Sequence, residues 1–162
     1  MGKLDGKVAI VTGGGTGIGK GIARAFATEG ARVVIASRSE QTLNELVEEL
    51  GDQVLAVPTD LKVEAQITAL FERTIVEMGQ LDILVNNSGV FEGGPIEELS
   101  LETWQHVMDV NLTGVFLCTR EAMKIMKPEC EHWQTTSMYR YIIGIRPLPP
   151  PLCSIWRQPM TI

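Results

Sequence analysis

A glycine-rich turn near the amino terminus is the feature that most constrains how this chain can fold. Residues 12–19 read Thr-Gly-Gly-Gly-Thr-Gly-Ile-Gly and follow a short apolar run, residues 8–11, that is rich in β-branched side chains. An amphipathic run, residues 18–29, comes next, with apolar residues at helical spacing: Ile18, Ile22, Ala25 and Phe26. This order predicts a buried strand, a tight turn and an amphipathic helix.

The spacing of the glycines gives the turn a physical role. A backbone that leaves a strand sharply and lets a diphosphate approach the first helical N–H groups has no room for Cβ atoms at Gly13, Gly17 and Gly19. The unpaired N–H groups and the helix dipole favour an anion there. An ordinary flexible turn is the alternative. A second β-forming run, residues 32–36, begins about one helix later, and this order favours nucleotide binding.

Two further motifs follow this turn along the chain. Asn-Asn-Ser-Gly occupies residues 86–89, and Asn111 lies within Val-Asn-Leu-Thr-Gly, residues 110–114. With the glycine turn, they make the chain from about residue 5 to residue 128 resemble the short-chain dehydrogenase/reductase family. The resemblance implies an α/β fold, a Rossmann-like doubly wound parallel sheet of order 3-2-1-4, truncated after the fourth strand and its following helices. It also implies an NADP(H)-binding oxidoreductase that acts on a carbonyl/alcohol pair.

The resemblance places a dinucleotide at the carboxyl ends of the strands. Asp60, with the Leu61 amide, lies where the family contacts adenine, and Ser88 stands where the family has alanine. As a structural alternative, Asp60 is a good N-cap for a helix over residues 62–78, and both roles can coexist. The full set of candidate cofactor-binding residues is Gly13, Thr16, Gly17, Ile18, Gly19, Ser37, Arg38, Asp60, Leu61, Asn87, Ser88 and Gly89.

The residues after the second predicted strand bear on the choice of cofactor. An acidic side chain at this strand end would bind the adenosine ribose hydroxyls and repel a 2′-phosphate. Here Ser37 is uncharged, and the Arg38 guanidinium suits bidentate phosphate contact, so NADP(H) is favoured over NAD(H). The alternative is a polar turn in which Ser39 caps the next helix, which leaves Arg38 without a role.

The remaining apolar patterns predict the other elements up to residue 126. We expect helices over residues 39–50, 62–78, 101–108 and 112–126, and strands over residues 54–57 and 81–85. Gly51 and Ser100 are predicted helix caps. The resemblance implies that Asn111 kinks the last helix and holds a water in a proton relay, whereas the alternative is a buried amide that bonds backbone carbonyls. It also implies a homo- or hetero-oligomer contact through residues 112–126.

Composition limits the other classes of function. The chain has 162 residues, which fit one domain, and its net charge of -6 argues against a nucleic-acid partner. We find no run long enough for a membrane span and no apolar leader, so we expect a cytoplasmic protein. Cys118 is expected to be a buried apolar residue. The only histidines, His106 and His132, give no persuasive metal site.

The pattern changes after Pro128. Residues 129–162 contain no Ala, Val, Asp, Asn, Phe or Lys, and they hold five of the eight prolines. The family's chemistry requires a serine and Tyr-x-x-x-Lys for proton transfer at the carbinol. Tyr139 and Tyr141 are each followed four residues on by isoleucine, and the last lysine is Lys127. We therefore interpret both tyrosines, and Ser137, as coincidences.

This loss of pattern divides the chain into two parts. Residues 1–128 are predicted to be an incomplete NADP(H)-binding domain, and residues 129–162 an irregular proline-rich tail, polyproline-like over residues 147–151. A frameshift near residue 128 and a spliced or shortened form both explain the tail. The chain alone is expected to be inactive. The alternatives are a non-catalytic binding or subunit-interaction fragment and a nonfunctional product.

The fourth strand would form an unpaired apolar edge, unless residues 141–145 supply a short strand.

Overall fold

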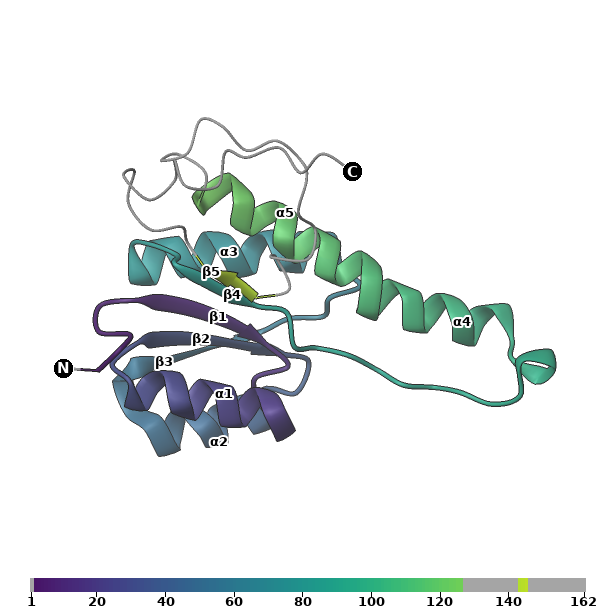
Figure 1. Cartoon of the computed structure of the whole chain (residues 1–162), viewed down its shortest axis with the longest axis horizontal. Coiled ribbons are helices and arrows are strands. Elements are labelled where there is room, and N and C mark those ends of the chain that lie inside the picture. The colour runs from purple at the N-terminus through teal and green to yellow at the C-terminus, as the bar shows by residue number, and fades with distance from the viewer. Residues whose placement is uncertain (1, 127–142, 146–162) are drawn as a thin grey trace, which may run out of the picture.

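The computed structural model describes residues 2–126 and 143–145. Four parallel strands form the predicted sheet, in the order β3-β2-β1-β4, with helices on both faces (Figure 1). The parallel strands are β1 Val8–Thr12, β2 Arg32–Ser37, β3 Val54–Pro58 and β4 Ile83–Val85. The α-helices are α1 Gly17–Thr28, α2 Glu40–Leu50, α3 Glu64–Met78, α4 Leu101–Met108 and α5 Val115–Met126, and short 3-10 turns cover Gly51–Gln53 and Ile96–Glu98. This arrangement confirms the predicted Rossmann-like fold.

The strands are apolar along their whole length because both faces of the sheet are covered. Successive side chains of β1 alternate between two cores, Ile10 on one side and Ala9 and Val11 on the other. Helices α3 and α5 cover the Ile10 face, and α1 and α2 cover the opposite face (Figure 1). Full burial of such side chains contributes about 1.5–3 kcal/mol each.

Helix α1 fully buries only small residues, and of its four apolar residues at helical spacing only Ile22 and Phe26 pack against the core, half-buried. Its buried residues are Gly19, Ala23 and Ala27, whereas Ile18 is 78% exposed. The expectation of a buried face with Ile18 and Ala25 was wrong, because a helix that lies close to the strands buries the stripe with the shortest side chains.

Helix caps agree with the sequence prediction in three of four places. Ser39 accepts a hydrogen bond from the Thr42 N–H and Ser100 from the Thr103 N–H, and Gly51 ends α2 with φ +67°. The prediction of Asp60 as a helix N-cap was wrong. Helix α3 begins only at Glu64, and the Asp60 carboxylate instead accepts from the Lys62 N–H in the preceding turn.

The edge of the sheet next to β4 is paired, contrary to the expectation of an open edge. Strand β5, Ile143–Ile145, lies antiparallel to β4, with Gly144 opposite Leu84. This strand falls within residues 141–145, where a short strand was the alternative. Strand β4 also begins two residues later than predicted. Just before it, the Asp82 N–H donates to the Val8 carbonyl.

The helical segment after residue 100 is not one α-helix from residue 112. Residues Asp109–Gly114 form a π-helix between α4 and α5, so the α-helical geometry starts at Val115. Figure 1 shows α4 and α5 aligned end to end, with α4 projecting beyond the sheet. The π-helix includes Asn111, the residue at which the resemblance implies a kink.

Several predictions fall outside the described residues. They concern His132, Ser137, Tyr139, Tyr141 and residues 147–151. Among the helices that the structure describes, none combines the length and the apolar character needed to cross a membrane.

Candidate functional site

A pocket of about 400 Å³ lies at the carboxyl ends of the parallel strands. It contains eleven of the twelve predicted cofactor residues, all except Gly19, together with three that sequence reasoning missed, Thr59, Val90 and Val110. Each missed residue is next to a predicted one in the chain, namely Asp60, Gly89 and Asn111. The complete lining is Gly13, Thr16, Gly17, Ile18, Ser37, Arg38, Thr59, Asp60, Leu61, Asn87, Ser88, Gly89, Val90 and Val110.

The glycines of the turn have different tasks. Gly13 and Gly17 have φ of +64° and +53°, the left-handed region that favours glycine. A Cβ on Gly17 would meet nothing within 4 Å, so the backbone at this pocket-lining residue is open to a ligand. A Cβ on Gly19 would lie 2.2 Å from the Gly13 oxygen. Gly19 therefore allows the close packing of α1 on the turn, outside the pocket.

The start of α1 fits an anionic group. Within the described part of the chain, the Thr16 side chain makes no capping hydrogen bond, and the first turn of α1 carries no acidic residue. The first N–H groups of the helix and its dipole thus favour negative charge beside Gly17. This donor set, with an open backbone and no competing carboxylate, suits a diphosphate.

Thr12 fixes the ends of β1 and β4, next to the pocket-lining residues Gly13 and Asn87. Its Oγ1 donates to the Val85 carbonyl at 3.3 Å and accepts from the N–H groups of Asn87 and Ser88, each at 3.0 Å. Asn87 Nδ2 in turn donates to the Thr12 carbonyl at 3.0 Å. These bonds use the one proton and both lone pairs of the hydroxyl, so the carboxyl ends of β1 and β4 are held in register. Thr12 is 1% exposed, and its place before Gly13 was the only sequence signal for this role.

The wall formed by the ends of β2 and β3 offers hydrogen-bond donors and an acceptor. Arg38 is exposed and makes no hydrogen bond or ion pair with any described residue. Asp60 accepts from the Lys62 N–H through Oδ1 at 3.0 Å, and none of the described residues donates to Oδ2. The Leu61 N–H also has no partner in the described ranges. A cation, a hydrogen-bond acceptor and a hydrogen-bond donor, each without a partner among the described residues, therefore line one side of the pocket.

Asn111 holds the pocket-lining residue Val90 through its side chain. Its Oδ1 accepts from the Val90 N–H and its Nδ2 donates to the Val90 carbonyl, both at 2.8 Å. Asn111 is exposed, so the alternative of a buried amide was wrong in its burial, although the side chain does bond a backbone carbonyl. Asn111 does not line the pocket itself. It fixes Val90, which does.

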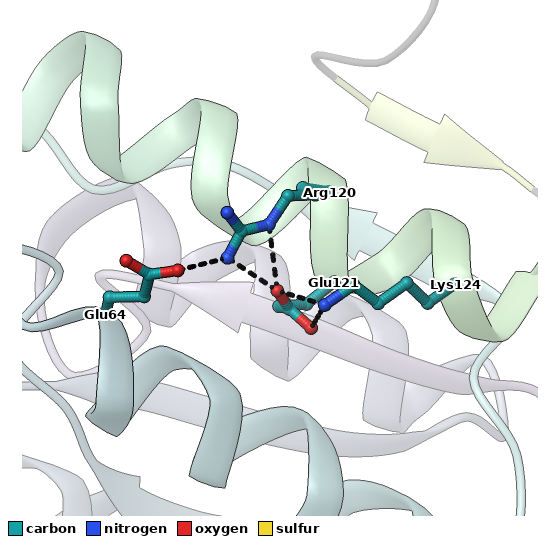
Figure 2. Close-up of polar contacts among 4 residues, drawn as sticks. All are labelled: Glu64, Arg120, Glu121 and Lys124. Carbon is teal, nitrogen blue, oxygen red and sulfur yellow. Dashed lines mark hydrogen bonds and ion pairs between the residues drawn. The ribbon is translucent and has the colours of Figure 1, made fainter.

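A second polar cluster lies between α3 and α5 (Figure 2). The Glu121 carboxylate accepts from Arg120 and from Lys124, at 2.9 and 2.6 Å, and Arg120 also donates to Glu64 at 2.6 Å. Burial raises the pKa of Glu121, but the hydrogen bonds from Lys124 and Arg120 outweigh it and hold that pKa below its usual range. Burial, with a contribution from Glu121, raises the pKa of the nearby Cys118 thiol to about 12. Cys118 is therefore a protonated, buried thiol, as predicted, and not a nucleophile.

Within residues 2–126 and 143–145, no group of three or more His, Cys, Asp or Glu side chains could hold a metal ion. The arrangement that the structure does offer is a pocket whose polar groups suit a phosphate-containing ligand. Its phosphate donors lie at a helix start, and its open polar groups lie along two strand ends.

Curated relatives match this chain over most of its length. An uncharacterized oxidoreductase of Methylorubrum extorquens is 42% identical over 128 residues, which are 76% of this chain and 52% of the relative. A 3-alpha-(or 20-beta)-hydroxysteroid dehydrogenase of Mycobacterium tuberculosis is 42% identical over 126 residues, 78% of this chain and 48% of the relative. The chain spans about half the length of these relatives.

Solved structures share the fold. A 3-ketoacyl-(acyl-carrier-protein) reductase from Brucella melitensis, complexed with NADH, has a TM-score of 0.75 and 39% identity over 77% of this chain and 52% of its own. A short chain dehydrogenase from Bacillus anthracis has a TM-score of 0.72 and 38% identity, over 75% of this chain and 52% of its own. The family model described as short chain dehydrogenase matches residues 7–133. Because that match covers most of the 162 residues, the chain belongs to the short chain dehydrogenase family, whose members are oxidoreductases with an NAD(P)-binding Rossmann fold.

Proposed function

We propose that residues 1–128 of this chain form an NADP(H)-binding unit. The observation that carries the proposal is the pocket at the strand ends, where a glycine turn, the start of α1 and the ends of β2, β3 and β4 converge. The diphosphate lies at the first N–H groups of α1, the adenosine lies against Ser37, Arg38, Asp60 and Leu61, and Asn87, Ser88 and Gly89 form the remaining wall. The cofactor supplies hydride chemistry, whereas these residues only bind and orient it.

The preference for NADP(H) over NAD(H) rests on Arg38. Its guanidinium is exposed at the end of β2 and is not engaged by any described side chain, so it is available to a 2′-phosphate. Ser37 adds no negative charge at the strand end. The NADH complex of the Brucella reductase concerns that protein and does not decide the preference here.

The test is a fluorescence titration of the full chain with NADPH and with NADH. We expect Arg38→Ala to weaken NADPH binding by roughly tenfold or more, because charge-assisted hydrogen bonds are lost, and to leave NADH binding unchanged. Arg73 is the matched control, since it is an exposed arginine on α3 that also has no partner among the described residues. Binding of neither cofactor would refute the binding unit, and equal binding of both would refute only the preference.

For the whole activity, we propose descent from an oxidoreductase that acts on a carbonyl/alcohol pair, in a chain that does not turn over substrate alone. The family membership supports the first part, and the lack of any Tyr-x-x-x-Lys in the sequence supports the second. A non-catalytic binding or subunit-interaction fragment, or a frameshifted product without function, are the alternatives. If the chain binds cofactor but does not reduce a carbonyl, it is the non-catalytic fragment. If the chain aggregates, it is the frameshifted product without function.

We also propose that the helical segment of residues 112–126 contacts a second subunit, of this chain or a related one, in the cytoplasm. Leu112 and Phe116 support this contact, since they lie four residues apart and are 53% and 60% exposed. Exposed apolar side chains at helical spacing are typical of a contact surface.

A further inference from the structure

The turn between β3 and α3 carries two pocket-lining residues whose polar groups are open. Asp60 Oδ2 is an acceptor and the Leu61 N–H is a donor, and neither has a partner among the described residues. Adjacent donor and acceptor groups complement the Watson–Crick edge of adenine, which pairs an amino donor with a ring-nitrogen acceptor. Such recognition requires that both groups keep a fixed position.

Three hydrogen bonds fix this turn. The Val63 N–H donates to the Asp60 carbonyl at 3.0 Å, and the Lys62 N–H donates to Asp60 Oδ1 at 3.0 Å. Both bonds lie within the turn and hold its shape. The third comes from outside the turn, because Gln66 Oε1 accepts from the Asp60 N–H at 2.7 Å. Gln66 lies in the first turn of α3, whose next residue, Ile67, is fully buried in the core.

We propose that Gln66 is a positioning residue for the adenine side of the pocket, which rests on the proposed function. Through the Asp60 N–H it ties the turn to α3, and α3 is anchored by its buried face. Gln66 does not line the pocket, so it acts only through Asp60 and Leu61. The Gln66 bond thus sets where the open acceptor and donor face the ligand.

A purely structural role for Gln66 is the alternative, and Gln80 provides a matched control. The Gln80 amide also joins distant parts of the chain, since its Nε2 donates to the Gly6 carbonyl at 2.9 Å and to Asp82 Oδ2 at 2.6 Å. These contacts lie at the amino end of β1, away from the pocket residues. Gln80→Ala therefore removes a similar amide without touching the adenine side.

The experiment titrates the full chain by calorimetry with two halves of the cofactor. Adenosine 2′,5′-bisphosphate reports on the adenine side, and reduced nicotinamide mononucleotide reports on the other end. We expect Gln66→Ala to weaken adenosine bisphosphate binding about fivefold, the equivalent of one neutral hydrogen bond, and to leave the nicotinamide half unchanged. Gln66→Glu keeps an acceptor oxygen and is expected to bind as the original chain does. Gln66→Met, which keeps the length without the acceptor, replaces Gln66→Ala if that variant does not fold.

The outcomes separate the inference from the proposed function. Selective loss for adenosine bisphosphate with rescue by Gln66→Glu supports the positioning role. Unchanged binding in Gln66→Ala, an equal loss for both halves, or the same loss in Gln80→Ala would overturn it while the binding unit stands. Failure of the original chain to bind NADPH or either half would instead reject the proposed function, and the inference with it.

Discussion

Gly19 and Gly21 lie two residues apart on α1, but only Gly21 has room for a methyl group. A Cβ on Gly19 would lie 2.2 Å from the Gly13 oxygen and 2.5 Å from Asn87 Nδ2, whereas a Cβ on Gly21 would meet nothing within 4 Å. Gly19→Ala is therefore expected to lower the free energy of unfolding by about 1–3 kcal/mol through overpacking. Gly21→Ala should raise it by roughly 0.5–1 kcal/mol, since alanine is the better helix former.

Urea unfolding of both variants measures this difference. Equal effects of the two substitutions would contradict the packing role of Gly19. The sequence predicted Gly19 as part of the glycine turn but could not separate packing from ligand contact. Both roles need a residue without a side chain, and only the distance to Gly13 distinguishes them.

Asp82 is a buried carboxylate whose charge is stabilised by hydrogen bonds. Burial raises its pKa, but donors from the Val8 N–H at 2.9 Å, Lys7 Nζ at 3.2 Å and Gln80 Nε2 at 2.6 Å together hold that pKa below the usual range. Since the folded-state pKa is the lower one, the carboxylate's contribution to stability is present above the ordinary aspartate pKa of about 4 and is lost as the pH falls through the folded value.

Asp82→Asn tests this contribution across a pH series. We expect it to lower the free energy of unfolding by roughly 1–3 kcal/mol between about pH 5 and pH 8, and the gap to the original chain should narrow below about pH 4. Asp52→Asn is the control, because Asp52 is exposed and its side chain makes no hydrogen bond or ion pair with the described residues. If the difference in free energy of unfolding between the Asp82→Asn variant and the original chain stays constant down to about pH 2, the role of the ionised form is contradicted.

Strand β5 covers an edge that would otherwise expose unpaired backbone groups. Strand β4 is apolar and buried along its length, and open edges of this kind associate with other strands. Gly144→Pro removes an N–H in the middle of β5, Ile143–Ile145, and fixes φ at about −65°, away from the extended geometry of an antiparallel strand. We expect this variant to form larger species in size-exclusion chromatography, or to lose solubility. The control Arg157→Pro changes the tail outside the described residues, and a Gly144→Pro chain that elutes as the original would contradict the edge-covering role.

The elements differ in how far the sequence could predict them. Strands β1 to β4 were predictable because burial on both faces leaves continuous apolar runs. The buried stripe of α1 was not, because Gly19, Ala23 and Ala27 carry little hydrophobic signal, while the exposed Ile18 lies at the same helical spacing as Ile22 and Phe26. The antiparallel direction of β5 was not predictable either, since strand pairing across more than fifty residues leaves no local pattern.

The pocket belongs to the whole molecule, and its predictability follows from topology. Parallel strands bring their carboxyl ends to one edge, so residues at or just after each strand end, such as Ser37, Asp60 and Asn87, could be assigned to one site. Val90 and Val110 could not, because they reach the pocket through the Asn111 side chain and the π-helix, which depend on tertiary contacts.

The surface along α4 and α5 bears on the proposed association of whole molecules. Four large apolar residues of this segment are exposed by 49–77%: Leu101, Trp104, Leu112 and Phe116. Because a two-fold contact uses the same patch on both copies, one charged substitution acts twice at the interface. Phe116→Glu is therefore expected to weaken association by roughly tenfold or more, as for a central apolar contact.

Light scattering after size-exclusion chromatography, over a range of concentrations, measures this association. Val76→Glu is the matched control, since Val76 is 81% exposed on α3, outside the segment of α4 and α5. Phe116 does not line the pocket, so NADPH binding by the Phe116→Glu chain should remain. If Phe116→Glu and Val76→Glu shift the mass alike, or neither shifts it, the contact through residues 112–126 is wrong. If only Phe116→Glu yields monomers that still bind NADPH, binding belongs to one chain and association to a separate surface.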